Sequence, residues 1–194
     1  MTILDPQFEA KLRLYFKRGN PLMLGLWRLG LGQWLNAWPE YGGRIMVLTQ
    51  TGRKTGRRHR TPLNYALVDG EAYCLAGFGS IADWYRNVMK NPQVEVWFPD
   101  GWWAGTAEDV SDSEARLGIL REVIIASGFA GRIFGFDAQK MTDEELDAAT
   151  TKYRLLHIKR TEARTGAGGP GDLAWVWPLA TMILLPMALS RRKR

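Results

Sequence analysis

Two β-rich runs that flank a short basic loop constrain this chain more than any other feature. The apolar run Ile45–Thr51 leads into the loop and a second run, Thr61–Val68, leads out of it. The loop contains Gly52 and Gly56, and its basic-type residues are Arg53, Lys54, Arg57, Arg58, His59 and Arg60. Glycine lets successive N–H groups converge on an anion, and Arg and Lys are strong donors to phosphate or carboxylate. Because like charges on one short loop repel each other unless an anion offsets them, we predict an anion-binding loop rather than a solvated hairpin.

Turn signals extend this pair of strands into a sheet. Asp69-Gly70 and Pro99-Asp100-Gly101 each separate two β-rich runs, which is typical of hairpins. We therefore expect strands near 45–51, 61–69, 71–77, 94–98, 102–110 and 153–159. Antiparallel hairpins with inserted helices predict an α+β fold, an antiparallel six-stranded split β-barrel with peripheral helices.

The expected helices are marked by start and stop signals. Residues 7–17 read as a short amphipathic helix that closes near Gly19-Asn20-Pro21. Ser80, Ser111 and Thr142 each begin a capping-box pattern, which predicts a helix start after each of them.

The charge is concentrated in two places. The net charge is +6, of which residues 53–60 supply +5 and residues 191–194 supply +4, so the remainder is net acidic. A nucleic-acid-binding protein would spread its basic residues over a face. We therefore expect no nucleic-acid partner, but two separate anionic contacts.

Cysteine and histidine usage limits the remaining chemistry. A single cysteine, Cys74, excludes a disulfide within the chain and a cysteine-based metal site. The two histidines lie far apart in the sequence, so we expect no metal site. Acidic and basic residues interrupt the first residues, which argues against a cleavable secretory signal. We expect a cytoplasmic protein.

Composition divides the chain into four parts. We expect N-terminal helices over 1–44, a split-barrel domain over 45–160, a flexible glycine-rich linker over 161–172, and an apolar segment with a basic tail over 173–194. Few contacts should cross the linker.

Two apolar segments raise the question of a membrane. Leu22–Trp38 contains three tryptophans, which suit either a membrane interface or a helix packed over the barrel, and both alternatives stay open. Leu173–Leu189 carries no charge, precedes Arg-Arg-Lys-Arg, and contains two prolines that would break or kink a helix. We expect peripheral contact with the cytoplasmic face of a membrane, the alternative being a cap on the barrel or a homodimer interface.

Two motifs carry a family resemblance. Leu-Thr-Gln-Thr-Gly-Arg-Lys-Thr-Gly at 48–56, with Arg-Thr-Pro-Leu-Asn-Tyr at 60–65, resembles the signature of the deazaflavin (F-420)-dependent nitroreductases, which include F-420H2-dependent quinone reductases. The segment Asp83–Val96 resembles that family's Trp-Tyr-x-Asn-Leu-x-x-Asn-Pro-x-Val segment. The resemblance implies a flavin-binding split β-barrel.

The resemblance also implies a set of cofactor-contacting residues. They are Arg53, Lys54 and Thr55 at the phosphate; His59, Arg60, Thr61, Pro62, Leu63 and Asn64 beneath the ring; Leu75, Ala76, Gly77 and Phe78 in a second lining segment; and Asp83, Trp84, Tyr85, Arg86 and Asn87 over the cofactor. Tyr65 is a weak candidate for orienting a substrate or giving it a proton, and a core tyrosine is the alternative.

The implied reaction is hydride transfer from reduced coenzyme F-420, an 8-hydroxy-5-deazaflavin, to an electron-poor quinone or nitro compound. The cofactor supplies the chemistry and the protein supplies orientation and electrostatics. Barrels of this architecture also bind FMN or haem, and a non-enzymatic membrane-associated binding module would use similar basic loops, so these alternatives stay open.

Overall fold

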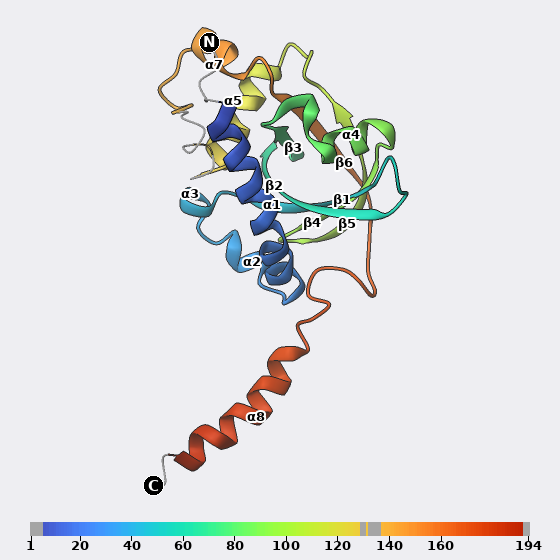
Figure 1. Ribbon diagram of the computed structural model, residues 1–194, viewed down its shortest axis with the longest axis vertical. Helices are drawn as coiled ribbons and strands as arrows, with labels where there is room; N and C mark the ends of the chain where they lie inside the picture. The colour runs from blue at the N-terminus through green and yellow to red at the C-terminus, as the bar shows by residue number, and fades with distance from the viewer. Residues whose placement is uncertain (1–5, 129–130, 132–136, 192–194) are drawn as a thin grey trace.

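The computed structural model describes residues 6–128, 131 and 137–191, and its centre is a closed six-stranded barrel (Figure 1). Neighbouring strands pair antiparallel in the order β1-β2-β3-β6-β5-β4. The strands are β1 (Ile45–Thr51), β2 (Arg58–Val68), β3 (Glu71–Ala76), β4 (Gln93–Phe98), β5 (Gly101–Asp109) and β6 (Arg154–Ala163). The predicted α+β fold and its six antiparallel strands are confirmed, but β2 begins at Arg58, so Arg58, His59 and Arg60 lie in a strand and not in the loop where they were expected.

Helices surround this barrel. Their bounds are α1 (Pro6–Arg28), α2 (Gly32–Leu35), α3 (Pro39–Gly42), the 3-10 turn η1 (Gly79–Ile81), α4 (Asp83–Lys90), α5 (Arg116–Ala126), α7 (Asp143–Thr150) and α8 (Val176–Arg191). α1 packs on β2, α4 on β1 and β5, and α5 on β2 and β3, while α8 projects away from the barrel (Figure 1).

Local sequence explains the hairpins and the continuous apolar run of β1. Asp69 and Gly70 both have positive φ, 53° and 82°, as a two-residue hairpin turn requires. Leu48 faces the barrel interior, whereas Val47 packs outside between Trp27 of α1 and Trp97 of β4. Because both faces of β1 are covered, its first four residues are all apolar rather than alternating.

The first helix is longer than predicted. It passes through Pro21 and ends only at Arg28, so the expected stop near residues 19–21 is wrong. Proline removes one helical hydrogen bond, but this loss is offset where the following turn buries Trp27, which is only 2 % exposed against Trp97. Within the segment Leu22–Trp38, Trp27 packs over the barrel as one alternative expected, while Trp34 and Trp38 are exposed.

Only one of the three predicted capping boxes forms. The Thr142 hydroxyl accepts from the Glu145 backbone N–H, and the Glu145 carboxylate accepts from the Thr142 N–H. α4 and α5 instead begin after Ala82 and Ala115 without a side-chain cap. Ser111 is buried, and its hydroxyl accepts from the Leu155 N–H of β6 at 2.9 Å. The side chain predicted to cap α5 therefore makes a tertiary contact instead.

The predicted linker is held to the body of the protein. Residues 161–163 belong to β6, because that strand runs on to pair Ala163 with Trp103 of β5. Further along, Asp172 accepts a bidentate ion pair from Arg28, with nitrogen–oxygen distances of 2.9 Å. The Leu173 N–H donates to the Arg28 carbonyl at 2.8 Å. The expectation that few contacts cross residues 160–172 is therefore wrong, while the tail residues 192–194 lie outside the described residues.

Candidate cofactor cavity

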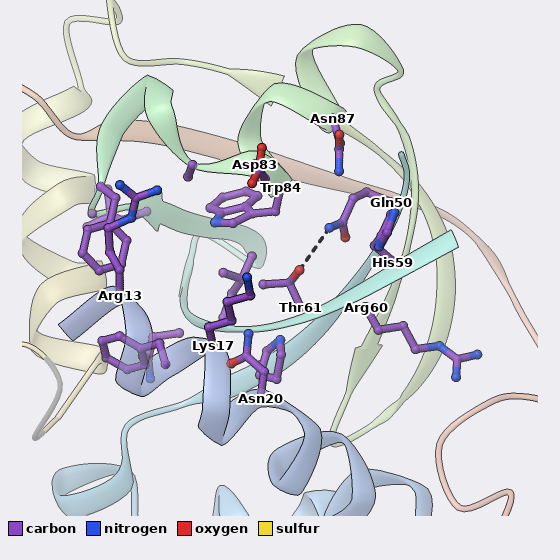
Figure 2. A pocket seen from close by; sticks show the side chains of 18 of the residues that line it. Arg13, Lys17, Asn20, Gln50, His59, Arg60, Thr61, Asp83, Trp84 and Asn87 are labelled. Atoms are coloured by element: carbon purple, nitrogen blue, oxygen red, sulfur yellow. Dashed lines mark hydrogen bonds between the residues drawn. The ribbon is translucent and has the colours of Figure 1, made fainter. Parts of the chain in front are cut away.

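A cavity of about 1010 Å³ opens beside the β1–β2 loop, between α1 and the N-terminal end of α4 (Figure 2). Pockets that bind cofactors and drug-sized ligands span roughly 300–1,000 Å³. The space is therefore large enough for a cofactor with an extended tail.

The backbone of the β1–β2 loop is shaped by its glycines. The Gly52 N–H donates to the Arg57 carbonyl and the Gly56 N–H donates to the Gly52 carbonyl, both at 2.8 Å. A Cβ on Gly52 would lie 2.7 Å from His59 Nε2 and 3.0 Å from Thr55 Oγ1, so a larger residue would displace both side chains. Gly52 thus lets the loop fold closely over the start of β2 at the cavity wall.

Arg53 joins this loop to α4. Its guanidinium donates to the Asp83 carboxylate at 2.9 Å and to Asn87 Oδ1 at 3.0 Å, and its backbone N–H donates to the same Asn87 oxygen at 3.1 Å. The hydrogen bond from Arg53 lowers the pKa of the Asp83 carboxyl. Arg53 therefore positions the loop against α4 as well as contributing charge.

The cavity is predominantly cationic at its rim. Among the described lining residues, the charged ones are Arg13, Lys17, Arg53, Lys54, Arg60 and a single carboxylate, Asp83. Neither Lys17 nor Lys54 forms an ion pair with any residue that the structure describes. These two ammonium groups come from different elements, α1 and the β1–β2 loop, and are available to an anion.

Arg60 lines the cavity, but its guanidinium points away from it (Figure 2). The group lies 4.6 Å from the centre of the Trp97 ring and donates to the Gly168 carbonyl at 2.6 Å. Burial, reinforced by the nearby charge of Arg58, lowers the pKa of Arg60. Its charged end therefore holds the chain that follows β6.

Apolar and neutral polar groups line the rest of the cavity. Pro62, Leu63, Phe78 and Trp84 provide apolar surface, and Phe16 of α1 meets Phe78 edge to face at 6.4 Å between ring centres. On the floor, the Gln50 amide and the Thr61 hydroxyl lie 3.0 Å apart (Figure 2). An apolar wall beside a cationic rim suits a planar ring that carries an anionic tail.

Most residues proposed from the resemblance lie around this cavity. Those that line it are Arg53, Lys54, Thr55, His59, Arg60, Thr61, Pro62, Leu63, Asn64, Leu75, Gly77, Phe78, Asp83, Trp84 and Asn87. The structure does not bring Ala76, Tyr85 or Arg86 to the lining. Ala76 is buried in the barrel core, and the Arg86 guanidinium donates to the Ser80 carbonyl.

Tyr85 and Tyr65, which the sequence singled out, are both buried beside defined partners. Tyr85 donates to the Asp109 carboxylate, and burial together with this bond raises its pKa to about 12. Tyr65 is 5 % exposed inside the barrel, edge to face with Phe98 at 5.0 Å between ring centres, and burial raises its pKa. The position of Tyr65 matches the core alternative, because it does not line the cavity.

Sequence reasoning missed the contribution of α1. This helix supplies Ala10, Arg13, Leu14, Phe16, Lys17 and Asn20 to the cavity wall, while Gln50, Ile124, Ser127 and Tyr153 also lie outside the proposed set. The available signal was the mixture of cations and aromatics over residues 7–17, but which side of that helix faces the barrel depends on packing.

Solved structures share parts of this architecture at low identity. An F420-H2 dependent reductase, FDR-A, is 21% identical and covers 60% of this chain and 94% of its own, with a TM-score of 0.43. A conserved hypothetical protein from Mycobacterium tuberculosis is 20% identical, with coverages of 72% and 90% and a TM-score of 0.46. The haem storage protein HutZ from Vibrio cholerae is 17% identical, with coverages of 66% and 89% and a TM-score of 0.43.

A family model matches residues 31–147, which is more than half of the chain and includes both signature motifs. On this match the chain belongs to the F420H(2)-dependent quinone reductase family.

Proposed function

We propose that this protein binds coenzyme F-420 in the cavity and catalyses hydride transfer from its reduced form to an electron-poor quinone or nitro compound. The observation that carries the proposal is the cationic rim beside an apolar wall in one cavity of about 1010 Å³. Family membership supports the same reductase class.

The donor set fits the two ends of this coenzyme. Its phosphodiester and glutamate tail carry negative charge, which Lys54 and Lys17 can meet without breaking an existing ion pair. Its ring system is planar and aromatic with polar groups at its edge, and the flat faces suit the surface formed by Pro62, Leu63 and Trp84. Thr61 and Gln50 offer hydrogen-bonding groups at the floor between these surfaces.

When bound, the deazaflavin supplies the hydride. The residues of this chain bind and orient the two reactants, and α1 forms a wall that limits the access of water. No side-chain acid/base pair is needed for a hydride to leave the donor, and Tyr65 lies outside the cavity lining. We assign the chain an orienting and electrostatic role.

A cofactor titration tests the proposal. Purified protein should bind F-420 with a saturable change in coenzyme fluorescence, and reduced F-420 should be oxidised by a quinone or nitroaromatic only when the protein is present. NADH should not replace the reduced deazaflavin. Binding of FMN or haem without binding of F-420, or turnover with NADH and FMN, would contradict the proposal and favour an alternative occupant.

The cellular location and the oligomeric state of the protein are also proposed. We propose a cytoplasmic location, with which a chain that has a single, buried cysteine, Cys74, is compatible. Formation of a homodimer stays a prediction that sedimentation of the purified protein would decide.

A further inference from the structure

The helix α8 exposes apolar side chains on every side. It projects from the body of the protein (Figure 1), and the chain carries no charged residue between Asp172 and Arg191. Four successive residues, Met182 to Leu185, are 72, 62, 61 and 54 % exposed. Successive helical residues point about 100° apart, so these four side chains surround the helix axis. Such a helix is stable only where something apolar encloses it.

The base of α8 is fixed beside the end of α1. The Trp177 indole donates to the Leu29 carbonyl at 2.8 Å, and the Asp172–Arg28 ion pair holds the preceding residues. Trp175 is 57 % exposed here. α2 starts three residues after Leu29, and its Trp34 is 66 % exposed. Exposed tryptophans from two distant parts of the sequence therefore lie near the base of α8.

The far end of α8 leads into basic residues. The sequence from residue 191 is Arg-Arg-Lys-Arg, which places four cations directly after the apolar segment. Indole rings prefer the boundary between hydrocarbon and water, and clustered cations are attracted to anionic headgroups. Both ends of the apolar helix thus carry groups that favour the surface of a bilayer.

We propose that α8, together with Trp34 and Trp175, binds the surface of a membrane that contains anionic lipid. A second protein chain would cover one stripe of the helix, whereas lipid acyl chains can surround its apolar side chains on every side. Among the described residues, no helix has both the length and the apolar character to cross a bilayer. The 16 residues of α8 would extend only about 24 Å. The apolar side chains of α8 would therefore be embedded at the headgroup–acyl boundary of one leaflet, with the indole rings at headgroup level.

This placement has a consequence for the cavity, which rests on the proposed function. α1 lines the cavity through Arg13, Lys17 and Asn20, and its last residue, Arg28, is paired to the base of α8. A hydrophobic quinone dissolved in the bilayer would then be close to the wall of the cavity.

Flotation with lipid vesicles tests the membrane surface without any cofactor. The full-length protein should float with phosphatidylcholine vesicles that contain phosphatidylserine, and more weakly with phosphatidylcholine alone. Ile183→Asp with Leu184→Asp should reduce binding at least tenfold, since charged groups oppose burial in hydrocarbon. Replacing residues 192–194 with alanine should reduce it roughly a hundredfold, as each cation contributes about fivefold near an anionic surface. Trp34→Ala with Trp175→Ala should also weaken binding.

The matched control is Met89→Asp, which places a charge on a 41 % exposed apolar residue of α4. This variant should float like the unchanged protein, and circular dichroism should show that all variants are folded. Failure of the unchanged protein to bind vesicles, or equal loss in the control, would overturn the proposal. The unchanged protein could instead self-associate without binding vesicles, and Ile183→Asp with Leu184→Asp could abolish that association. This result would mean that a second copy of the chain covers α8, and it would also overturn the proposal. F-420 binding tests the cavity separately, so either proposal can fail alone.

Discussion

Replacing Lys54 with alanine separates a direct contact with the cofactor from the general charge of the loop. Lys54 lines the cavity, is exposed, and forms no ion pair with a described residue. Its removal should therefore change the free energy of unfolding by no more than about 0.5 kcal/mol, which is usual for surface substitutions. Any effect on ligand affinity can then be assigned to the cavity.

The expected loss follows from one charge-assisted hydrogen bond. Such bonds contribute about 1.5–3 kcal/mol, which corresponds to roughly a tenfold to a hundredfold increase in Kd for F-420. Fluorescence titration of the coenzyme measures this change directly. Lys17→Ala, on α1, should have an effect of the same order, because its ammonium is equally available.

Arg57 provides the matched control within the same loop. It is exposed and does not line the cavity, so Arg57→Ala removes the same unit of charge without removing a contact. Its effect should be small and should disappear as salt is added, because long-range attraction is screened. An equal loss from Arg57→Ala and Lys54→Ala, or full affinity in both Lys54→Ala and Lys17→Ala, would refute the assignment of the anion to this rim.

Three further predictions concern the structure around the cavity. Arg53→Ala should raise the pKa of Asp83, which NMR titration measures. Because the pKa of Asp83 is lowered in the folded state, the stabilisation from this pair is present at neutral pH and is lost as the pH falls through that pKa. The free energies of unfolding of the variant and the unchanged protein should therefore differ least in acid. Gly79→Ala should lower the free energy of unfolding more than Gly70→Ala in denaturant titrations. Both glycines have positive φ, which costs alanine about 1–2 kcal/mol, but only at Gly79 would a Cβ lie 2.4 Å from a backbone carbonyl oxygen. Equal losses in the two variants would contradict this contact. Thr142→Ala should lower the free energy of unfolding by about 1 kcal/mol through loss of the capping box, and an unchanged denaturation midpoint would show that the cap contributes nothing.

The sequence by itself determined the six strands and the turn at the glycines of the basic loop, although Arg58, His59 and Arg60 belong to β2 and not to the loop. The strands follow from short-range patterns: a positive-φ turn at Asp69-Gly70 joins two β-rich runs, and the continuous apolar run of β1 marks a strand buried on both faces. About half of the candidate cavity could be located, because those residues cluster in or between two short motifs. Local signals were sufficient wherever neighbouring residues in the chain made the contacts.

The tertiary structure decided what depended on distant partners. α1 continues past Pro21 because the next turns pack Trp27 on Trp97, which no local propensity can anticipate. The Ser111 hydroxyl does not cap a helix, because it accepts a hydrogen bond from the buried Leu155 N–H of β6. The Arg60 guanidinium points away from the cavity, because it donates to the carbonyl of Gly168, which is distant in the sequence. A helix stop, a cap and a charged side chain each have several local options of similar energy, and contacts between residues far apart in the sequence select among them.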